Sequence, residues 1–135
     1  MLETPEFGPD REAALLSPLQ LAYIGDTVWD LMVRTGLLHT GMNVHSMHCA
    51  AVSKVNARAQ AQALLKLDGL LTAEEMDLVR RGRNAHPRHG APKNQDPASY
   101  CQATGLETLI GFLYLAGRHE RLRELYSLCQ AEAAS

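Results

Sequence analysis

Two acidic residues interrupt the two most hydrophobic segments of this chain. Asp26 lies in LAYIGDTVWDLMVR, residues 21–34, and Glu107 lies in TGLETLIGFLYLAG, residues 104–117. A carboxylate buried in a medium of low dielectric constant is costly unless a cation or hydrogen bonds compensate its charge. A metal ion bound by both side chains would compensate both charges at once, and this is the interpretation we favour. The alternative for either acid is a salt bridge to a buried arginine or a helix cap.

Paired carboxylates are suited to Mg²⁺, which prefers oxygen ligands, retains several waters and is commonly held by one or two carboxylates together with substrate phosphates. Phosphodiester hydrolysis needs an activated water and neutralisation of the charge that develops on the phosphate oxygens, and a divalent ion supplies both. We therefore expect Asp26 and Glu107 to be catalytic and metal-binding, with Mg²⁺ as the cofactor and Mn²⁺ as a substitute.

The segment Arg80–Lys93, RRGRNAHPRHGAPK, is basic in a chain whose formal net charge is −2. It contains five fixed positive charges and no acid, which is the electrostatic signature of a phosphate-binding surface. Its prolines and glycines predict a loop. A solvated basic loop without a ligand is the alternative. The candidate phosphate-binding residues are Arg80, Arg81, Arg83, Arg88 and Lys93.

Several neighbouring residues have more than one interpretation. Arg81, Arg83 and Asn84 could instead cap helix ends or hold the acidic side chains in place. Lys54 and Arg58 lie one turn apart on a predicted helix and would extend the basic path. We count Lys54 and Asn84 as supporting residues.

Apolar residues recur at helical spacing along most of the chain, and no alternating pattern of strand length occurs, so we predict an all-α fold. Ser17 before Pro18 and the T-x-x-E box that starts at Thr72 are typical helix starts. Gly36 and Gly82 are expected to end the first and third helices. The predicted helices cover residues 18–35, 43 or 46 to 67, 72–82, 98–116 and 118–131.

The predicted helix that carries Asp26 is apolar on nearly every side, which is typical of a helix at the centre of a domain. Gly25 removes a side chain directly beside Asp26, at a cost in helix stability of about 1 kcal/mol. Close approach of another backbone or of a ligand would explain this glycine. Glu107 likewise lies between Gly105 and Gly111, so we expect the two helices to bring both acids to one place.

The length of 135 residues is sufficient for one compact domain. We expect a single domain over residues 1–135, with residues 1–16 as a poorly structured lead-in. The chain has no apolar run of about 18 residues that could span a membrane, and its start lacks the pattern of a secretory signal. We therefore expect a cytoplasmic protein.

Cysteine and histidine usage gives little support to a second metal site. Cys49, Cys101 and Cys129 are widely spaced, which argues against a disulfide framework and a thiolate zinc site, so we expect three small buried hydrophobic residues. His45 and His48 have an HxxH spacing that is compatible with zinc. No third ligand is placed near them, so a structural role is the favoured interpretation.

Four motifs in this chain occur in the order that is typical of one family. They are LAYIGD at residues 21–26, RRGRNA at 80–85, PKN at 92–94 and TGLETLIGFLYL at 104–115. In this respect the chain resembles the catalytic domain of ribonuclease III, and most closely its small bacterial branch, Mini-ribonuclease III, which lacks a double-stranded-RNA-binding domain. The resemblance spans roughly residues 17–125 and implies the helical bundle of that endonuclease domain.

The resemblance implies a metal-dependent endoribonuclease that cleaves double-stranded RNA as a homodimer and leaves 5′-phosphate and 3′-hydroxyl ends. Asp26 matches the family's catalytic aspartate and Glu107 its metal-binding glutamate. The implied substrate is a bacterial ribosomal RNA precursor, that of 23S rRNA, with a ribosomal protein as a candidate assistant. Because 28 residues follow Glu107, we expect no further RNA-binding domain after it.

The chain departs from the full-length ribonuclease III pattern at the outer acids. Leu19, Ala22 and Thr104 occupy three of those positions, and Gln60 corresponds to a fourth. Loss of these carboxylates is typical of the Mini branch. The alternative function is a non-catalytic helical RNA-binding protein that retains the fold and keeps its acids for structural reasons.

Overall fold

The computed structural model describes residues 10–85 and 96–131, and every regular element within them is an α-helix. The predicted all-α fold is confirmed. The helices are α1 (Asp10–Ala13), α2 (Pro18–Leu37), α3 (Val44–Val55), α4 (Ala57–Leu65), α5 (Ala73–Asn84), α6 (Pro97–Leu115) and α7 (His119–Gln130). No helix among the described residues is both long and apolar enough to cross a membrane.

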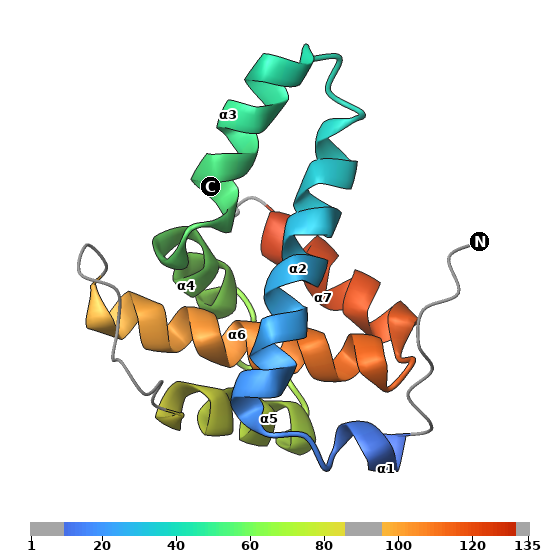
Figure 1. Ribbon diagram of the computed structural model, residues 1–135, viewed down its shortest axis with the longest axis vertical. Helices are drawn as coiled ribbons and strands as arrows, with labels where there is room; N and C mark the ends of the chain where they lie inside the picture. Colours follow the sequence, from blue (N-terminus) through green and yellow to red (C-terminus); the bar gives the residue numbers. More distant parts are fainter. Residues whose placement is uncertain (1–9, 86–95, 132–135) are drawn as a thin grey trace.

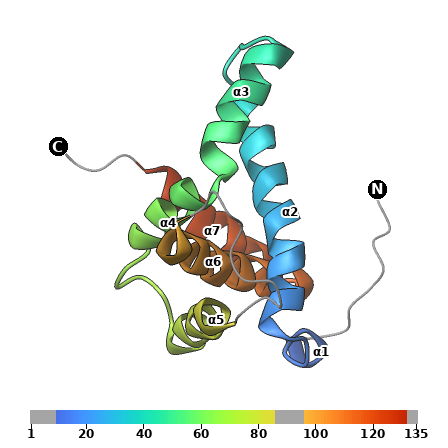
Figure 2. The ribbon, with the colours of Figure 1, turned by 60° about the vertical axis from the view of Figure 1, so that its left-hand side comes forward.

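The central helix is α6, and the prediction that the Asp26 helix occupies the centre is wrong. Helix α6 packs against α1, α2, α4, α5 and α7, and in Figures 1 and 2 α2 crosses it. One face of α2 is instead open to solvent: Tyr23 is 78% exposed and Leu31 63% exposed. Helix α3 lies beside the second half of α2, and this pair projects from the rest of the molecule (Figure 1).

Helices α2 and α6 meet through two glycines. A Cβ atom added to Gly25 would lie 1.8 Å from the carbonyl oxygen of Glu107, and one added to Gly111 would lie 1.9 Å from the carbonyl oxygen of Leu21. Real Cβ atoms cannot approach so closely, so both positions require glycine. The expectation that another backbone approaches Gly25 is confirmed, and that backbone is the turn of α6 that carries Glu107.

The single helix predicted to extend to residue 67 is interrupted at Asn56. The backbone of Asn56 is extended, with φ −73° and ψ 162°, so it ends α3 and begins α4. Its side-chain oxygen accepts a hydrogen bond from the backbone N–H of Ala59 at 2.8 Å, and its amide nitrogen donates to the carbonyl of Val52 at 3.2 Å. Asparagine competes in this way with the backbone hydrogen bonds of a continuous helix.

Two predicted helix ends are also wrong, because both glycines lie within helices. Helix α2 continues past Gly36 to Leu37, and α5 continues past Gly82 to Asn84. Gly82 is instead a contact with α6, where an added Cβ would lie 2.4 Å from Oγ1 of Thr108. The first part of the basic segment is therefore helical and not a loop.

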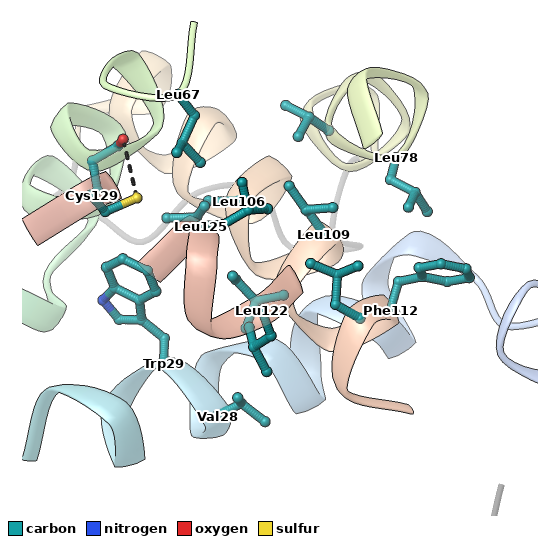
Figure 3. Packing of buried hydrophobic residues seen from close by; sticks show 14 of the residues in the cluster. Val28, Trp29, Leu67, Leu78, Leu106, Leu109, Phe112, Leu122, Leu125 and Cys129 are labelled. Atoms are coloured by element: carbon teal, nitrogen blue, oxygen red, sulfur yellow. Dashed lines mark hydrogen bonds between the residues drawn. The ribbon is translucent and has the colours of Figure 1, made fainter. Parts of the chain in front are cut away.

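The core is formed where α2, α4, α5 and α7 converge on α6. Figure 3 shows Leu106 and Leu109 of α6 beside Leu122 and Leu125 of α7, with Trp29 of α2 at the edge of this group. Trp29 also makes an edge-to-face contact with the ring of Tyr126, with ring centroids 5.2 Å apart.

Two smaller expectations need correction. The lead-in is structured from Asp10, because α1 packs on α6 and Ala13 is fully buried; residues 1–9 lie outside the described residues. Among the cysteines Cys129 is buried, as expected, and its Sγ donates to the carbonyl oxygen of Ala63 at 3.5 Å. Cys101 is partly buried and Cys49 is exposed.

Candidate active site

Asp26 and Glu107 line one open pocket of about 380 Å³. Its walls come from the first half of α2, the junction of α3 and α4, and the first half of α6. The contact of Gly25 with the backbone of Glu107 explains this convergence, because the aspartate follows the glycine directly. The prediction that Asp26 and Glu107 lie in one place is therefore confirmed. The close contact of Gly25 with the backbone of Glu107 brings them together.

The two carboxyl groups have different surroundings. Glu107 is partly buried, as predicted, whereas Asp26 is exposed, so the prediction that Asp26 lies in a buried sector is wrong. Burial raises the pKa of Glu107 to about 9, and the hydrogen bond and negative charge of Asp26 add to this increase. The side chain of Gln60 acts in the opposite direction and lowers the pKa of Glu107. Without a cation the pair therefore holds a proton on Glu107 at neutral pH.

The pocket fits a hard divalent cation that keeps part of its water shell. It offers oxygen ligands from two carboxylates, and no group of three or more His, Cys, Asp or Glu side chains exists among the described residues. Mg²⁺ is commonly bound in this way, with waters and substrate phosphates completing its octahedron. A cation would also relieve the repulsion between Asp26 and Glu107. Asp26 and Glu107 would hold it.

The structure does not support the salt-bridge interpretation of the two acids. Within the described part of the chain, no ion pair involves Asp26 or Glu107, and neither residue caps a helix. An arginine does neutralise the buried carboxylate of Glu75, which accepts hydrogen bonds from the partly exposed Arg121 at 2.7 and 2.8 Å.

The four positions at which the resemblance implies outer acids also line this pocket. They are Leu19, Ala22, Thr104 and Gln60. Thr104 donates its hydroxyl to the carbonyl of Tyr100 at 3.0 Å, in its own helix. Gln60 is 2% exposed, and its Nε2 atom has no hydrogen-bond partner. Gln60 therefore lies in the same pocket as the two carboxylates.

Sequence reasoning missed three polar residues of the pocket, namely Tyr23, Asn56 and Tyr100. Helical spacing contained a signal for two of them. Tyr23 precedes Asp26 by three residues and Tyr100 precedes Glu107 by seven, so each shares a helix face with its acid. For Asn56 the sequence contained no comparable signal, because its position depends on the break between α3 and α4.

The described basic residues lie away from this pocket. Arg80, Arg81, Arg83 and Asn84 form the last turns of α5, and none of them lines the carboxylate pocket. The Cγ of Arg83 would lie 2.9 Å from a Cβ added to Gly105, on a different face of α6 from Glu107. The interpretation in which these residues hold the carboxylates in place is therefore not supported.

The basic side chains at the end of α5 differ in their contacts with other residues. Arg80 pairs with Asp77 on the surface, and Arg83 lines a separate pocket beside Gln102. Arg81 and Arg83 are in the last turn of α5, where a positive charge favours the helix dipole. Arg88 and Lys93 lie outside the described residues.

Lys54 is exposed at the end of α3 and lines a different pocket, with Trp29 and Lys66. Its carbonyl oxygen accepts from Nε1 of Trp29 at 3.4 Å. Arg58 is exposed on α4. These two residues border the junction at Asn56, which lines the carboxylate pocket.

The histidines on α3 do not form a metal site with the rest of the described chain. His45 and His48 are exposed, and the nearest partner of His45 is Cys49, with Nε2 and Sγ 3.8 Å apart. No third ligand completes this set within the ranges that the structure describes.

Comparison with known proteins places the chain among the ribonucleases III. The Ribonuclease III domain matches residues 19–118, which include both acids. Mini-ribonuclease 3 of Symbiobacterium thermophilum is 51% identical over 111 residues, covering 82% of this chain and 85% of that protein. Mini-ribonuclease 3 of Thermoanaerobacter sp. is 41% identical over 128 residues, covering 94% and 89%.

A solved structure has a similar fold. The crystal structure of a protein from Fusobacterium nucleatum matches with a TM-score of 0.76 and 29% identity, covering 83% of this chain and 91% of that chain. Because the domain match covers most of the chain and the relatives are similar over nearly their whole length, the chain belongs to the ribonuclease III family, in its Mini-ribonuclease 3 branch.

Proposed function

We propose that this ribonuclease is a Mg²⁺-dependent endoribonuclease that hydrolyses double-stranded RNA. The observation that carries the proposal is the meeting of Asp26 and Glu107 in one open pocket, on two helices far apart in sequence. A family fold kept only for RNA binding would not need two unpaired carboxylates side by side, since their repulsion costs stability.

The two acids have complementary tasks in this proposal. Glu107, partly buried and with its backbone against Gly25, is the rigid ligand, and Asp26 is the exposed ligand on the side where RNA arrives. The bound divalent ion, Mg²⁺ or Mn²⁺, would supply charge neutralisation at the scissile phosphate and a lowered pKa for the attacking water. The products would carry 5′-phosphate and 3′-hydroxyl ends.

Double-stranded RNA is the proposed class of substrate. Duplex RNA offers phosphates and 2′-hydroxyl groups across a wide, shallow minor groove, so a helical protein would recognise mainly its shape and backbone. Arg80, Arg81 and Arg83 at the end of α5 are separated from the carboxylates by α6. We assign them to phosphates at a distance from the cut, together with Arg88 and Lys93 of the same basic segment.

A homodimer is part of the proposal. Helices α2 and α3 expose large apolar residues to solvent, and exposed apolar surface is typical of protein interfaces. A second copy of the chain would cover part of this surface. The exposed apolar residues are Leu19, Tyr23, Leu31, Val44 and Val52.

The native substrate would be a ribosomal RNA precursor, that of 23S rRNA, processed in the bacterial cytoplasm with assistance from a ribosomal protein. Support for this finer assignment is limited to the bacterial relatives named Mini-ribonuclease 3. Incubation with a precursor transcript, with and without added ribosomal proteins, tests it, and cleavage confined to unrelated duplexes would contradict it.

The test of activity is cleavage of a perfect RNA duplex in Mg²⁺, compared with EDTA and with single-stranded RNA of the same sequence. Glu107→Gln removes one ligand charge and keeps the shape, so cleavage should be lost. Glu120→Gln, at an exposed site on α7, is the matched control and should cleave normally. Duplex binding without cleavage in any divalent ion would favour the non-catalytic RNA-binding alternative.

A further inference from the structure

Gln60 carries a buried amide group that lacks a hydrogen bond. Its side chain is 2% exposed, and Nε2 has no partner among the described residues. An unsatisfied buried donor is unfavourable and uncommon in native proteins. A buried glutamine without a partner indicates that the amide has a partner in the working state of the protein.

The position of Gln60 restricts what this partner can be. Gln60 and Glu107 line the same pocket, and the Gln60 side chain lowers the pKa of the Glu107 carboxyl group. Its backbone N–H donates to the carbonyl of Asn56 at 3.0 Å, so the cap at Asn56 fixes the first turn of α4 that presents Gln60. The amide is therefore held by a defined backbone and faces the more buried of the two acids.

We infer that Gln60 is a positioning residue, whose Nε2–H donates to one carboxylate oxygen of Glu107 and directs the other oxygen toward the metal ion. This inference rests on the proposed metal-dependent function. A hydrogen bond from an amide to a carboxylate is stronger than one between two neutral groups. Ligating carboxylates are commonly held by such outer hydrogen bonds.

A neutral amide suits this position better than the acid of larger relatives. Asp26 and Glu107 already repel each other, and a third carboxylate would add to the negative charge of the pocket. An amide orients Glu107 without adding charge. The negative charge of the metal-free pocket is then limited to the two carboxylates.

The main experiment measures binding of Mn²⁺ alone, by calorimetry, to the full chain without RNA. Gln60→Met keeps the length of the side chain and removes the donor. Loss of an outer partner lowers metal affinity by about 10- to 100-fold, so we expect at least tenfold weaker Mn²⁺ binding with an unchanged or higher Tm. Gln62→Met, at an exposed position on the same helix, is the control and should bind as wild type.

A second variant tests the position of residue 60 without relying on metal affinity. Gln60→Glu should lower the Tm of the metal-free protein more than Gln62→Glu does. Added Mg²⁺ should restore a larger part of the lost Tm in Gln60→Glu than in Gln62→Glu. Equal Mn²⁺ affinity of wild type and Gln60→Met would overturn the inference and leave the proposed function intact. A wild-type chain that binds no divalent ion would overturn both.

Discussion

The Cα of Gly25 lies against the backbone carbonyl of Glu107, so closely that an added Cβ would be 1.8 Å from that oxygen. This contact joins the two acidic segments, because Gly25 directly precedes Asp26. The separation of the two carboxylates is thus set by a helix crossing and not by side-chain choice alone. Stability of the fold and geometry of the site depend on the same glycine.

Gly25→Ala should therefore damage both properties. The methyl group has backbone on two sides and no flexible neighbour that could move away, so α2 and α6 must separate, and we expect a loss of about 3 kcal/mol or more. Gly36→Ala is the control on the same helix, since its nearest neighbour is the Tyr126 hydroxyl at 3.8 Å. That variant should gain about 0.5–1 kcal/mol from helix propensity. Urea unfolding measures both, and equal stabilities would contradict the close crossing.

Glu107→Gln should be inactive and, without divalent ions, more stable than wild type. The folded protein holds the proton of Glu107 up to about pH 9, compared with 4.5 for the ordinary carboxyl group. The stabilising contribution of this group is therefore complete below pH 4.5 and is lost as the pH rises toward 9. The Tm advantage of the variant should grow over this interval and shrink when Mg²⁺ is added. A variant less stable than wild type at high pH, without metal, would contradict the shared burial of the two acids.

The Glu75–Arg121 ion pair should contribute to stability without contributing to catalysis. Glu75 is 3% exposed and Arg121 also donates to the carbonyl of Leu70 at 2.9 Å, so this pair ties α5 and the preceding loop to α7. Arg121→Met leaves a buried carboxylate unpaired and should cost about 3 kcal/mol. The exposed pair Asp30–Arg34 is the control, because Arg34→Met should cost less than about 1 kcal/mol.

The same ion pair predicts how stability responds to acid. Its hydrogen bonds from Arg121 lower the pKa of Glu75 below the ordinary value of 4.5. The contribution of Glu75 is therefore present above pH 4.5 and is lost as the pH falls through its lowered pKa. Wild type and Arg121→Met should converge in stability at low pH. A constant difference between them from neutral pH down to strong acid would rule out an ionic contribution.

The sequence predicted the fold class and the two acids because both leave strong local patterns. A carboxylate inside an apolar segment is visible without coordinates, and capping boxes such as that at Thr72 were found where predicted. The break at Asn56 was missed because the sequence alone does not distinguish an asparagine inside a helix from an asparagine that caps one. The break sets the start of α4, the helix that carries Gln60.

Burial around the acidic helices was harder to predict. Periodicity identifies apolar faces but not which of them a neighbour covers, so α2 was placed at the centre although Tyr23 and Leu31 are exposed. The run of small and apolar residues on α6, which lets several helices approach it, was the better signal. Likewise, the prolines and glycines of the basic segment predicted a loop over its whole length. In the structure, Gly82 lies inside α5 and packs against α6, and α5 continues to Asn84.

The final prediction concerns the basic end of α5. If Arg83 contacts an RNA phosphate, Arg83→Ala should weaken duplex binding for every sequence and lower the slope of log affinity against log salt concentration by about 1. Because the stem of Arg83 packs at Gly105, Arg83→Met is the informative partner variant: it keeps this packing and should lose the same salt dependence. Arg34→Ala, on the projecting half of α2, should change neither quantity. Unchanged affinity and salt slope in both Arg83 variants would assign this arginine to helix packing and leave the phosphates to other residues.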